Sequence, residues 1–80
     1  MSTSPIKIEP IAVDVLFQNN ALHVILADGR EISAPLEWFP RLLTANEKQR
    51  NRWKLIGRGI GIHWDDLDED ISIENLLAVS

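Results

Sequence analysis

Apolar and polar residues alternate along the segment 10–34, and a period of two with many β-branched residues predicts β-strands. The apolar residues of 22–27 and 30–34 predict a second and a third strand after the first. In the first strand, the predicted faces are Ile11, Val13 and Val15 on one side, and Ala12, Asp14 and Leu16 on the other.

Two polar turns separate these strands. Gln18-Asn19-Asn20 joins the first two strands, since asparagine tolerates the left-handed conformation that tight turns require. Asp28-Gly29 joins the second and third, and is typical of a type I′ hairpin in which both central residues have a positive φ. The segment 10–34 therefore predicts an antiparallel β-meander.

Helix signals come after the meander. Pro40 suits the first turn of a short helix, where the N–H group that proline lacks is not needed. Thr44 and Glu47 have the spacing of a capping box, which predicts a helix over about 45–52. Ser72 is suited to cap a last short helix, with Glu74 in the first turn.

The segment 54–64 has strand-like apolar residues interleaved with three glycines, and an exposed acidic loop is predicted after it. The predicted fold class is therefore α+β. It combines a small antiparallel β-meander over about 10–34, further short strands near 54–64, and two or three short helices. Residues 1–9 are predicted to be a flexible lead-in, and residues 10–80 a single domain.

The composition limits the class of protein. A chain of 80 residues has room for one domain, and without cysteine it cannot use disulfides or cysteine-bound zinc for stability. Its N-terminal residues lack the basic and apolar regions of a signal peptide, and no apolar run approaches the ~20 residues of a membrane helix. These features predict a cytoplasmic protein with no membrane association.

Charge is divided into two blocks. Residues 41–58 carry six basic side chains against one acidic, whereas residues 65–74 carry six acidic side chains and no basic one. The blocks either face each other or lie on separate solvated surfaces. The basic block could also contact a phosphate backbone, although the neighbouring acidic block would repel one. Its members are Arg41, Lys48, Arg50, Arg52, Lys54 and Arg58.

Candidate catalytic and metal-binding motifs are incomplete. His63 and Asp65 would share one face of a strand, but no nucleophile motif accompanies them, and no spacing joins them to His23 in a zinc site. The alternating Asp66, Asp68 and Asp70 lack the glycine and glutamate of a calcium loop. The glycines of 57–61 are followed by an extended pattern instead of a phosphate-binding helix, and indicate a bend or close backbone packing. The sequence therefore predicts no enzyme activity, no cofactor and no metal.

The aromatic side chains are predicted to form the core, because a small chain needs their large apolar surface. One of them could instead anchor a protein interface. The residues concerned are Trp38, Phe39, Trp53 and Trp64.

One combination of motifs, spread over residues 10–78, resembles the bacterial family of unknown function DUF2442. The matching residues are Asp28-Gly29-Arg30, Pro35-Leu36, Trp38-Phe39-Pro40-Arg41-Leu42, Ala45, Arg50, Trp53, Gly57, Gly59, Gly61-Ile62-His63-Trp64, Leu67, Asp68-Glu69-Asp70-Ile71-Ser72 and Leu76-Leu77.

The resemblance implies a small α+β domain without established catalytic residues. Stand-alone relatives are often encoded beside another small protein, an arrangement similar to a toxin–antitoxin pair. It implies a non-catalytic interaction module, with this chain as the antitoxin-like half. We expect Arg50, Asp68, Glu69 and Asp70 in the partner-binding surface, since complementary charge favours selective association. A nucleic-acid-binding regulator using residues 41–58 is the alternative, and an exposed edge strand leaves a homodimer open.

Overall fold

A computed structural model describes residues 10–79, so the predicted lead-in over 1–9 lies outside the described residues. The strands are β1 (Ala12–Gln18), β2 (Ala21–Leu26), β3 (Glu31–Pro35), β4 (Trp53–Ile56), β5 (Gly61–Trp64) and β6 (Glu69–Ser72). The α-helices are α1 (Pro40–Leu43), α2 (Glu47–Arg50) and α3 (Ile73–Val79), and the 3₁₀ turns are η1 (Leu36–Trp38), η2 (Gly57–Gly59) and η3 (Asp65–Leu67). These elements confirm the predicted α+β class.

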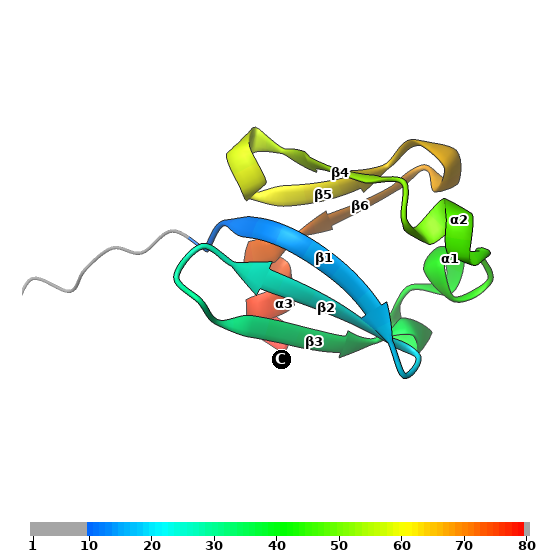
Figure 1. The fold of residues 1–80 in the computed structure, drawn as a ribbon, viewed down its shortest axis with the longest axis horizontal. Helices are drawn as coiled ribbons and strands as arrows, with labels where there is room; N and C mark the ends of the chain where they lie inside the picture. The colour runs from blue at the N-terminus through cyan, green and yellow to red at the C-terminus, as the bar shows by residue number, and fades with distance from the viewer. Residues whose placement is uncertain (1–9, 80) are drawn as a thin grey trace, which may run out of the picture.

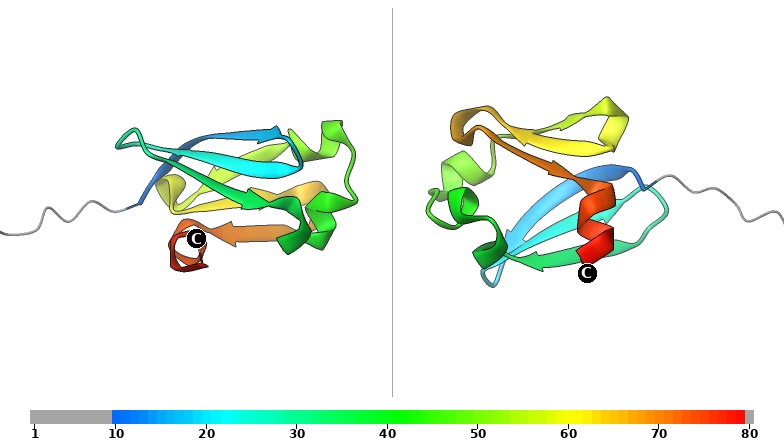
Figure 2. Two further views of the ribbon diagram at one scale, coloured as in Figure 1. Left: turned by 90° about the horizontal axis from the view of Figure 1, so that it is seen from below. Right: turned by 180° about the vertical axis from the view of Figure 1, so that it is seen from behind.

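Two antiparallel sheets of three strands each build the domain, with the strand orders β1-β2-β3 and β4-β5-β6. Figure 1 shows them as two layers, with the later sheet above the earlier one. Figure 2 shows α3 directly after β6, and this helix contacts β3 of the other sheet. The meander predicted over 10–34 is confirmed as the first sheet.

The core lies between the layers and receives side chains from both sheets. Leu22 and Val24 of β2, and Ile62 and Trp64 of β5, have no exposed surface. In β2 the residues on either side of them are half-buried, which is the alternation expected of a sheet with one face on a core. In β5, His63 is half-buried between Ile62 and Trp64, whereas Gly61 is also buried. Each sheet thus covers the apolar face of the other.

The predicted faces of β1 were wrong at the start of the strand. Ala12 and Val15 are buried, whereas Val13 is 52% exposed. The pairing of β1 with β2 shifts register between Ala12 and Asp14, as a β-bulge does. One extra residue in the strand reverses the faces on either side of it, so strict alternation fails there.

Both predicted turns are present, with one difference in type. Asn19 and Asn20 have φ values of 53° and 59°, as a type I′ turn requires. Between β2 and β3, Gly29 has a φ of 93° and donates its N–H to the carbonyl of Leu26, while Asp28 is not in the left-handed region. This connection is a longer hairpin loop ending in a left-handed glycine, so the expected type I′ geometry was wrong here.

The predicted capping box was also misplaced. Asn46, not Thr44, begins α2: its side chain accepts the Gln49 N–H at 2.8 Å, and the Gln49 side chain accepts the Asn46 N–H at 3.0 Å. Thr44 instead donates its hydroxyl to the Pro40 carbonyl and ends α1. Because Thr44 completes the preceding helix, it cannot start the next one, and the helix predicted over 45–52 shortens to α2.

The glycines after β4 serve close packing. Gly59 is buried with a φ of 99°, and a Cβ placed on it would lie 2.5 Å from the backbone oxygen of Ala12. The segment is thus pressed against the start of β1, as the alternative to a phosphate loop predicted. Ile60 then leads into β5, so the predicted strands near 54–64 form a hairpin.

β6 was not predicted. Its residues were assigned to an exposed acidic loop, yet they pair with β5 in register, and Ile71 is buried. The strand has four residues, and the first two are both acidic. The alternation of apolar and polar residues that predicts a strand is therefore not visible in the sequence. Ser72 ends it and caps α3 as predicted, since its hydroxyl accepts the Asn75 N–H at 3.3 Å.

Candidate functional site

The basic and acidic blocks touch each other. Arg52 lies 3.3 Å from Asp66, and Lys54 lies 3.0 Å from Asp65. These pairs join β4 and the residue before it to η3 at one end of the second sheet. Arg41 of α1 reaches the same region and donates to the backbone carbonyl of Asp68. Part of the basic segment is therefore used within the domain.

Arg50 has a structural position. Its guanidinium donates to the carbonyls of Leu42 and Leu43 at 2.8 and 2.9 Å, satisfying the C-terminal end of α1. The Arg50 carbonyl accepts the indole N–H of Trp64 at 2.9 Å. The expectation that Arg50 contacts a partner stays a prediction, but its side chain already holds the helical connection onto the core.

The acidic residues 68–70 do not share one face. Asp68 has a φ of 50° and ends η3, with its carbonyl turned to Arg41. Glu69 pairs with Trp64 in the register of β5 and β6 and is half-buried, whereas Asp70 pairs with His63 and is exposed. Asp68 and Asp70 are thus the more accessible members of the predicted partner-binding set.

His63 lies between two carboxylates on the outer face of the second sheet. Its Nε2 is 2.7 Å from Asp65, and its Nδ1 contacts Asp70. The hydrogen bond with Asp70, together with both nearby charges, raises the pKa of His63 above its ordinary value. The hydrogen bond from Lys54 lowers the pKa of Asp65. When His63 is protonated, the cluster Lys54–Asp65–His63–Asp70 is a cross-strand chain of alternating charge.

These groups do not converge on a common point. The two ring nitrogens of His63 point to different carboxylates, so a metal ion could not bind the ring and both acids together. Across residues 10–79, no group of three or more His, Asp or Glu side chains is arranged to hold a metal ion.

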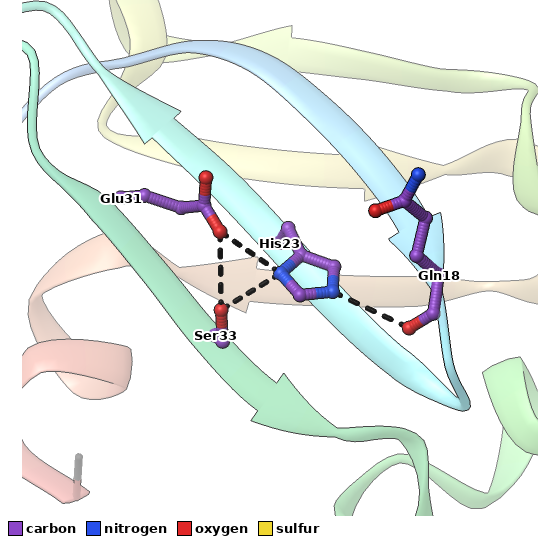
Figure 3. A network of polar contacts seen from close by, with 4 residues as sticks. All are labelled: Gln18, His23, Glu31 and Ser33. Carbon is purple, nitrogen blue, oxygen red and sulfur yellow. Dashed lines mark hydrogen bonds and ion pairs between the residues drawn. The ribbon is translucent and has the colours of Figure 1, made fainter.

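A second histidine network lies on the outer face of the first sheet (Figure 3). His23 Nδ1 is 2.7 Å from the Ser33 hydroxyl and 3.0 Å from Glu31, and Nε2 is 3.3 Å from the Gln18 carbonyl. A serine–histidine–acid relay needs the serine and the acid on opposite ring nitrogens. Here both share Nδ1, so the network joins β2 to β3 without the geometry of a nucleophile and its base.

A groove opens between η1 and the β6–α3 segment. Its volume is about 290 Å³. Trp38 on one wall is 49% exposed, although sequence reasoning left open which aromatic residue might lie outside the core. By contrast, Trp64 is fully buried. The groove is lined by Trp38, Phe39, Asp70, Ile71, Ser72, Asn75 and Leu76.

The sequence contained only part of this site. Asp70 lines the groove, and its expected place in a partner-binding surface stays a prediction. Trp38, Asn75 and Leu76 were not assigned to a site, because nothing local distinguishes an aromatic residue in the core from one beside a groove. Their proximity depends on β6, which brings η1 and α3 to the same edge.

Two antiparallel three-stranded sheets around one core, with short helices at their connections, define a small α+β domain. The family model described as "Protein of unknown function (DUF2442)" matches residues 12–80, so the chain belongs to this family. Among curated proteins, none matches the chain. Within residues 10–79, no helix is long and apolar enough to cross a membrane.

Two solved structures have a similar fold. A protein of unknown function from Rhodospirillum rubrum is 28% identical with a TM-score of 0.77, over 90% of this chain and 89% of that chain. An uncharacterized protein from Chromobacterium violaceum is 23% identical with a TM-score of 0.73, over 85% of this chain and 64% of that chain. The second likeness concerns the fold alone.

Proposed function

We propose that this chain is a non-catalytic, cytoplasmic protein-interaction module, the antitoxin-like partner of a small bacterial protein. The observation that carries the proposal is the half-exposed Trp38 beside a groove whose lining is partly apolar. Tryptophan has a large apolar surface and is the residue type most enriched at interface hot spots. A partner side chain in the groove would remove this surface from water.

Charge at the groove supports a protein partner with basic residues. Asp70 lies on the rim, Asp68 is close by in sequence and exposed, and the whole chain has a net charge of −4. Acidic side chains around an apolar centre give selectivity and speed association with a basic surface.

The alternative is a nucleic-acid-binding regulator that uses residues 41–58, and it has less support. Arg41, Arg50, Arg52 and Lys54 already contact carbonyl or carboxylate groups of the domain. Helices α1 and α2 have four residues each, too short to fill a major groove as recognition helices do. Binding of this kind would weaken steeply with salt.

The experiment is recovery of the tagged chain from its own host, followed by reconstitution with the purified partner. We expect one small protein at near-equal amount, bound by the wild-type chain and at least about tenfold more weakly by Trp38→Ala. Leu16→Ala is the matched control, because Leu16 is 45% exposed on the other sheet. Equal affinities of wild type and Trp38→Ala would contradict the proposed surface.

The acidic residues give a second reading from the same assay. Asp68→Asn, Glu69→Gln and Asp70→Asn together should weaken partner binding, because they remove negative charge while keeping the shape of each side chain. Unchanged affinity would exclude these residues from the interface. Affinity for DNA or RNA that falls with salt, without a protein partner, would favour the alternative function instead.

A further inference from the structure

We propose that the partner is bound by strand addition: an extended segment with an apolar side chain next to a lysine or arginine pairs with the free edge of β6. This inference rests on the proposed function and specifies how the same groove is used. It follows from the backbone of β6, the shape of the groove and the charge beside it.

The backbone phase of β6 decides which groups are available. Among residues 10–79, β6 has β5 as its one neighbour in the sheet, so its other edge is unpaired there. The Ile73 N–H donates to the Ile60 carbonyl at 3.0 Å, and Ile62 is the register partner of Ile71. Antiparallel pairs alternate between bonded and non-bonded, so Ile71 and Ile73 direct their backbone groups toward β5.

The residues in between therefore direct theirs to the outside. These are the N–H and C=O of Asp70 and the N–H of Ser72. Asp68 belongs to the same series, and its carbonyl already accepts a hydrogen bond from Arg41, a residue outside the sheet. Among residues 10–79, no other element provides a backbone partner for the outward groups of Asp70 or for the Ser72 N–H. A short extended segment could satisfy them.

The groove is beside this edge. Asp70, Ile71 and Ser72 form one side of it, and Trp38 and Phe39 form the other. A strand added to β6 would lie about 4.8 Å from it and send alternate side chains to opposite faces. Those on one face would enter the groove against Trp38 and Leu76, as in other cases of strand addition, where the backbone gives affinity and pockets give specificity.

The charge around the edge selects the segment. Asp70 is the one ionisable side chain that lines the groove among the described residues, and this side chain is 68% exposed. Glu37 precedes Trp38 and is also exposed. An apolar anchor would fill the groove, while a neighbouring lysine or arginine would lie against the exposed part of Asp70, whose carboxylate also contacts His63. An acidic segment would be repelled.

The first test separates the backbone of Asp70 from its side chain. Peptides are selected from a displayed library of random linear sequences by using the full chain as bait. We expect enriched peptides to carry an apolar residue next to lysine or arginine. Asp70→Pro, which lacks the outward N–H, should bind them at least about tenfold more weakly than Asp70→Ala, which lacks only the carboxylate. Equal binding by the two variants would contradict strand addition.

The second test uses the wild-type chain, so it does not depend on whether Asp70→Pro folds. Hydrogen exchange of the Asp70 and Ser72 amides should slow at least about tenfold when a selected peptide is bound. Binding that depends on Trp38 but leaves both amides unprotected would overturn strand addition while the proposed function stands. If no binding depends on Trp38, both strand addition and the proposed function are overturned. Protection of these amides by the chain alone, rising with its concentration, would identify a second copy as the occupant and contradict the basic segment.

Discussion

Phe17 of β1 and Trp64 of β5 meet edge to face, with ring centroids 6.4 Å apart and planes inclined at 66°. The contact joins the two sheets: Trp64 has no exposed surface, and the partly buried Phe17 packs against the core. It also connects the core to the helices, because the Trp64 indole donates to the Arg50 carbonyl. Trp64 therefore holds three parts of the chain together.

Truncation of Trp64 should be the most damaging change at an aromatic position. We expect Trp64→Ala to lower the free energy of unfolding by about 3–5 kcal/mol, through lost apolar contact and the cavity that remains. Urea denaturation followed by circular dichroism measures it. Trp38→Ala is the matched control and should cost less than about 1 kcal/mol, because Trp38 is half-exposed. Similar losses in the two variants would show that the core is not centred on Trp64.

Gly59 should tolerate no side chain. We expect Gly59→Ala to destabilise the domain by about 2–4 kcal/mol, because the added methyl group would overlap the Ala12 carbonyl oxygen in a left-handed conformation. Gly29→Ala separates the two causes: Gly29 has a similar φ of 93°, but no atom in the described part of the chain lies within 4 Å of its added Cβ. That control should cost only about 1–2 kcal/mol. Equal effects would contradict the close contact between η2 and β1.

Arg50 and Arg52 should differ although each carries one positive charge. Arg50→Ala removes charged donors from the Leu42 and Leu43 carbonyls and should lower the unfolding free energy by about 1.5–3 kcal/mol. Arg52→Ala removes an exposed ion pair with Asp66 and should cost less than about 1 kcal/mol. Chemical denaturation compares them. A stable Arg50→Ala variant with weakened partner binding would instead place Arg50 in the interface.

Protonated His63 should stabilise the fold. Its pKa is raised above 6.5 in the folded state, first by the hydrogen bond with Asp70. A raised folded pKa means that the folded state binds the proton more tightly, so this contribution is complete below pH 6.5 and is lost as pH rises through the folded pKa. The other charged groups of the cluster around His63 are Lys54, Asp65 and Asp70.

As pH rises from below 6.5 through the folded pKa of His63, the urea midpoint of the wild-type chain should therefore fall more than that of His63→Gln. Nuclear magnetic resonance titration of the His63 ring gives the pKa directly, and Asp70→Asn should lower it. A His63 pKa at or below the ordinary value would contradict the paired geometry. The reverse sign applies to Asp65, whose lowered pKa gives a contribution that is present above pH 3.8 and is lost as pH falls through the folded value.

Local signals in the sequence were reliable where one or two residues determine a backbone conformation. Asn19-Asn20 is suited to a left-handed turn, Pro40 to the start of a helix and Ser72 to a helix cap, and each has that position in the structure. The position of the capping box could not be decided in this way, since both Thr44 and Asn46 are good caps. The preceding helix decides the position: Thr44 is the C-cap residue of α1, so Asn46 caps α2.

The candidate site was only partly predictable for a related reason. Acidic residues 68–70 stood out by composition, but β6 is strand-like only because β5 lies beside it and Ile71 faces the core. The groove beside Trp38 is formed partly by β6, so it could not be predicted without that strand. The local sequence therefore does not show that Trp38 is half-exposed while Trp64 is buried.

By itself, then, the sequence determined the class of fold, the first meander, the turns and the separation of charge, because these depend on neighbouring residues and on the alternation of apolar side chains. The tertiary structure decided which tryptophan is exposed, which arginine holds a helix end, and that an acidic segment becomes an edge strand. Each of these depends on contacts between residues far apart in the chain. Such pairing and burial cannot be predicted from the pattern of neighbouring residues.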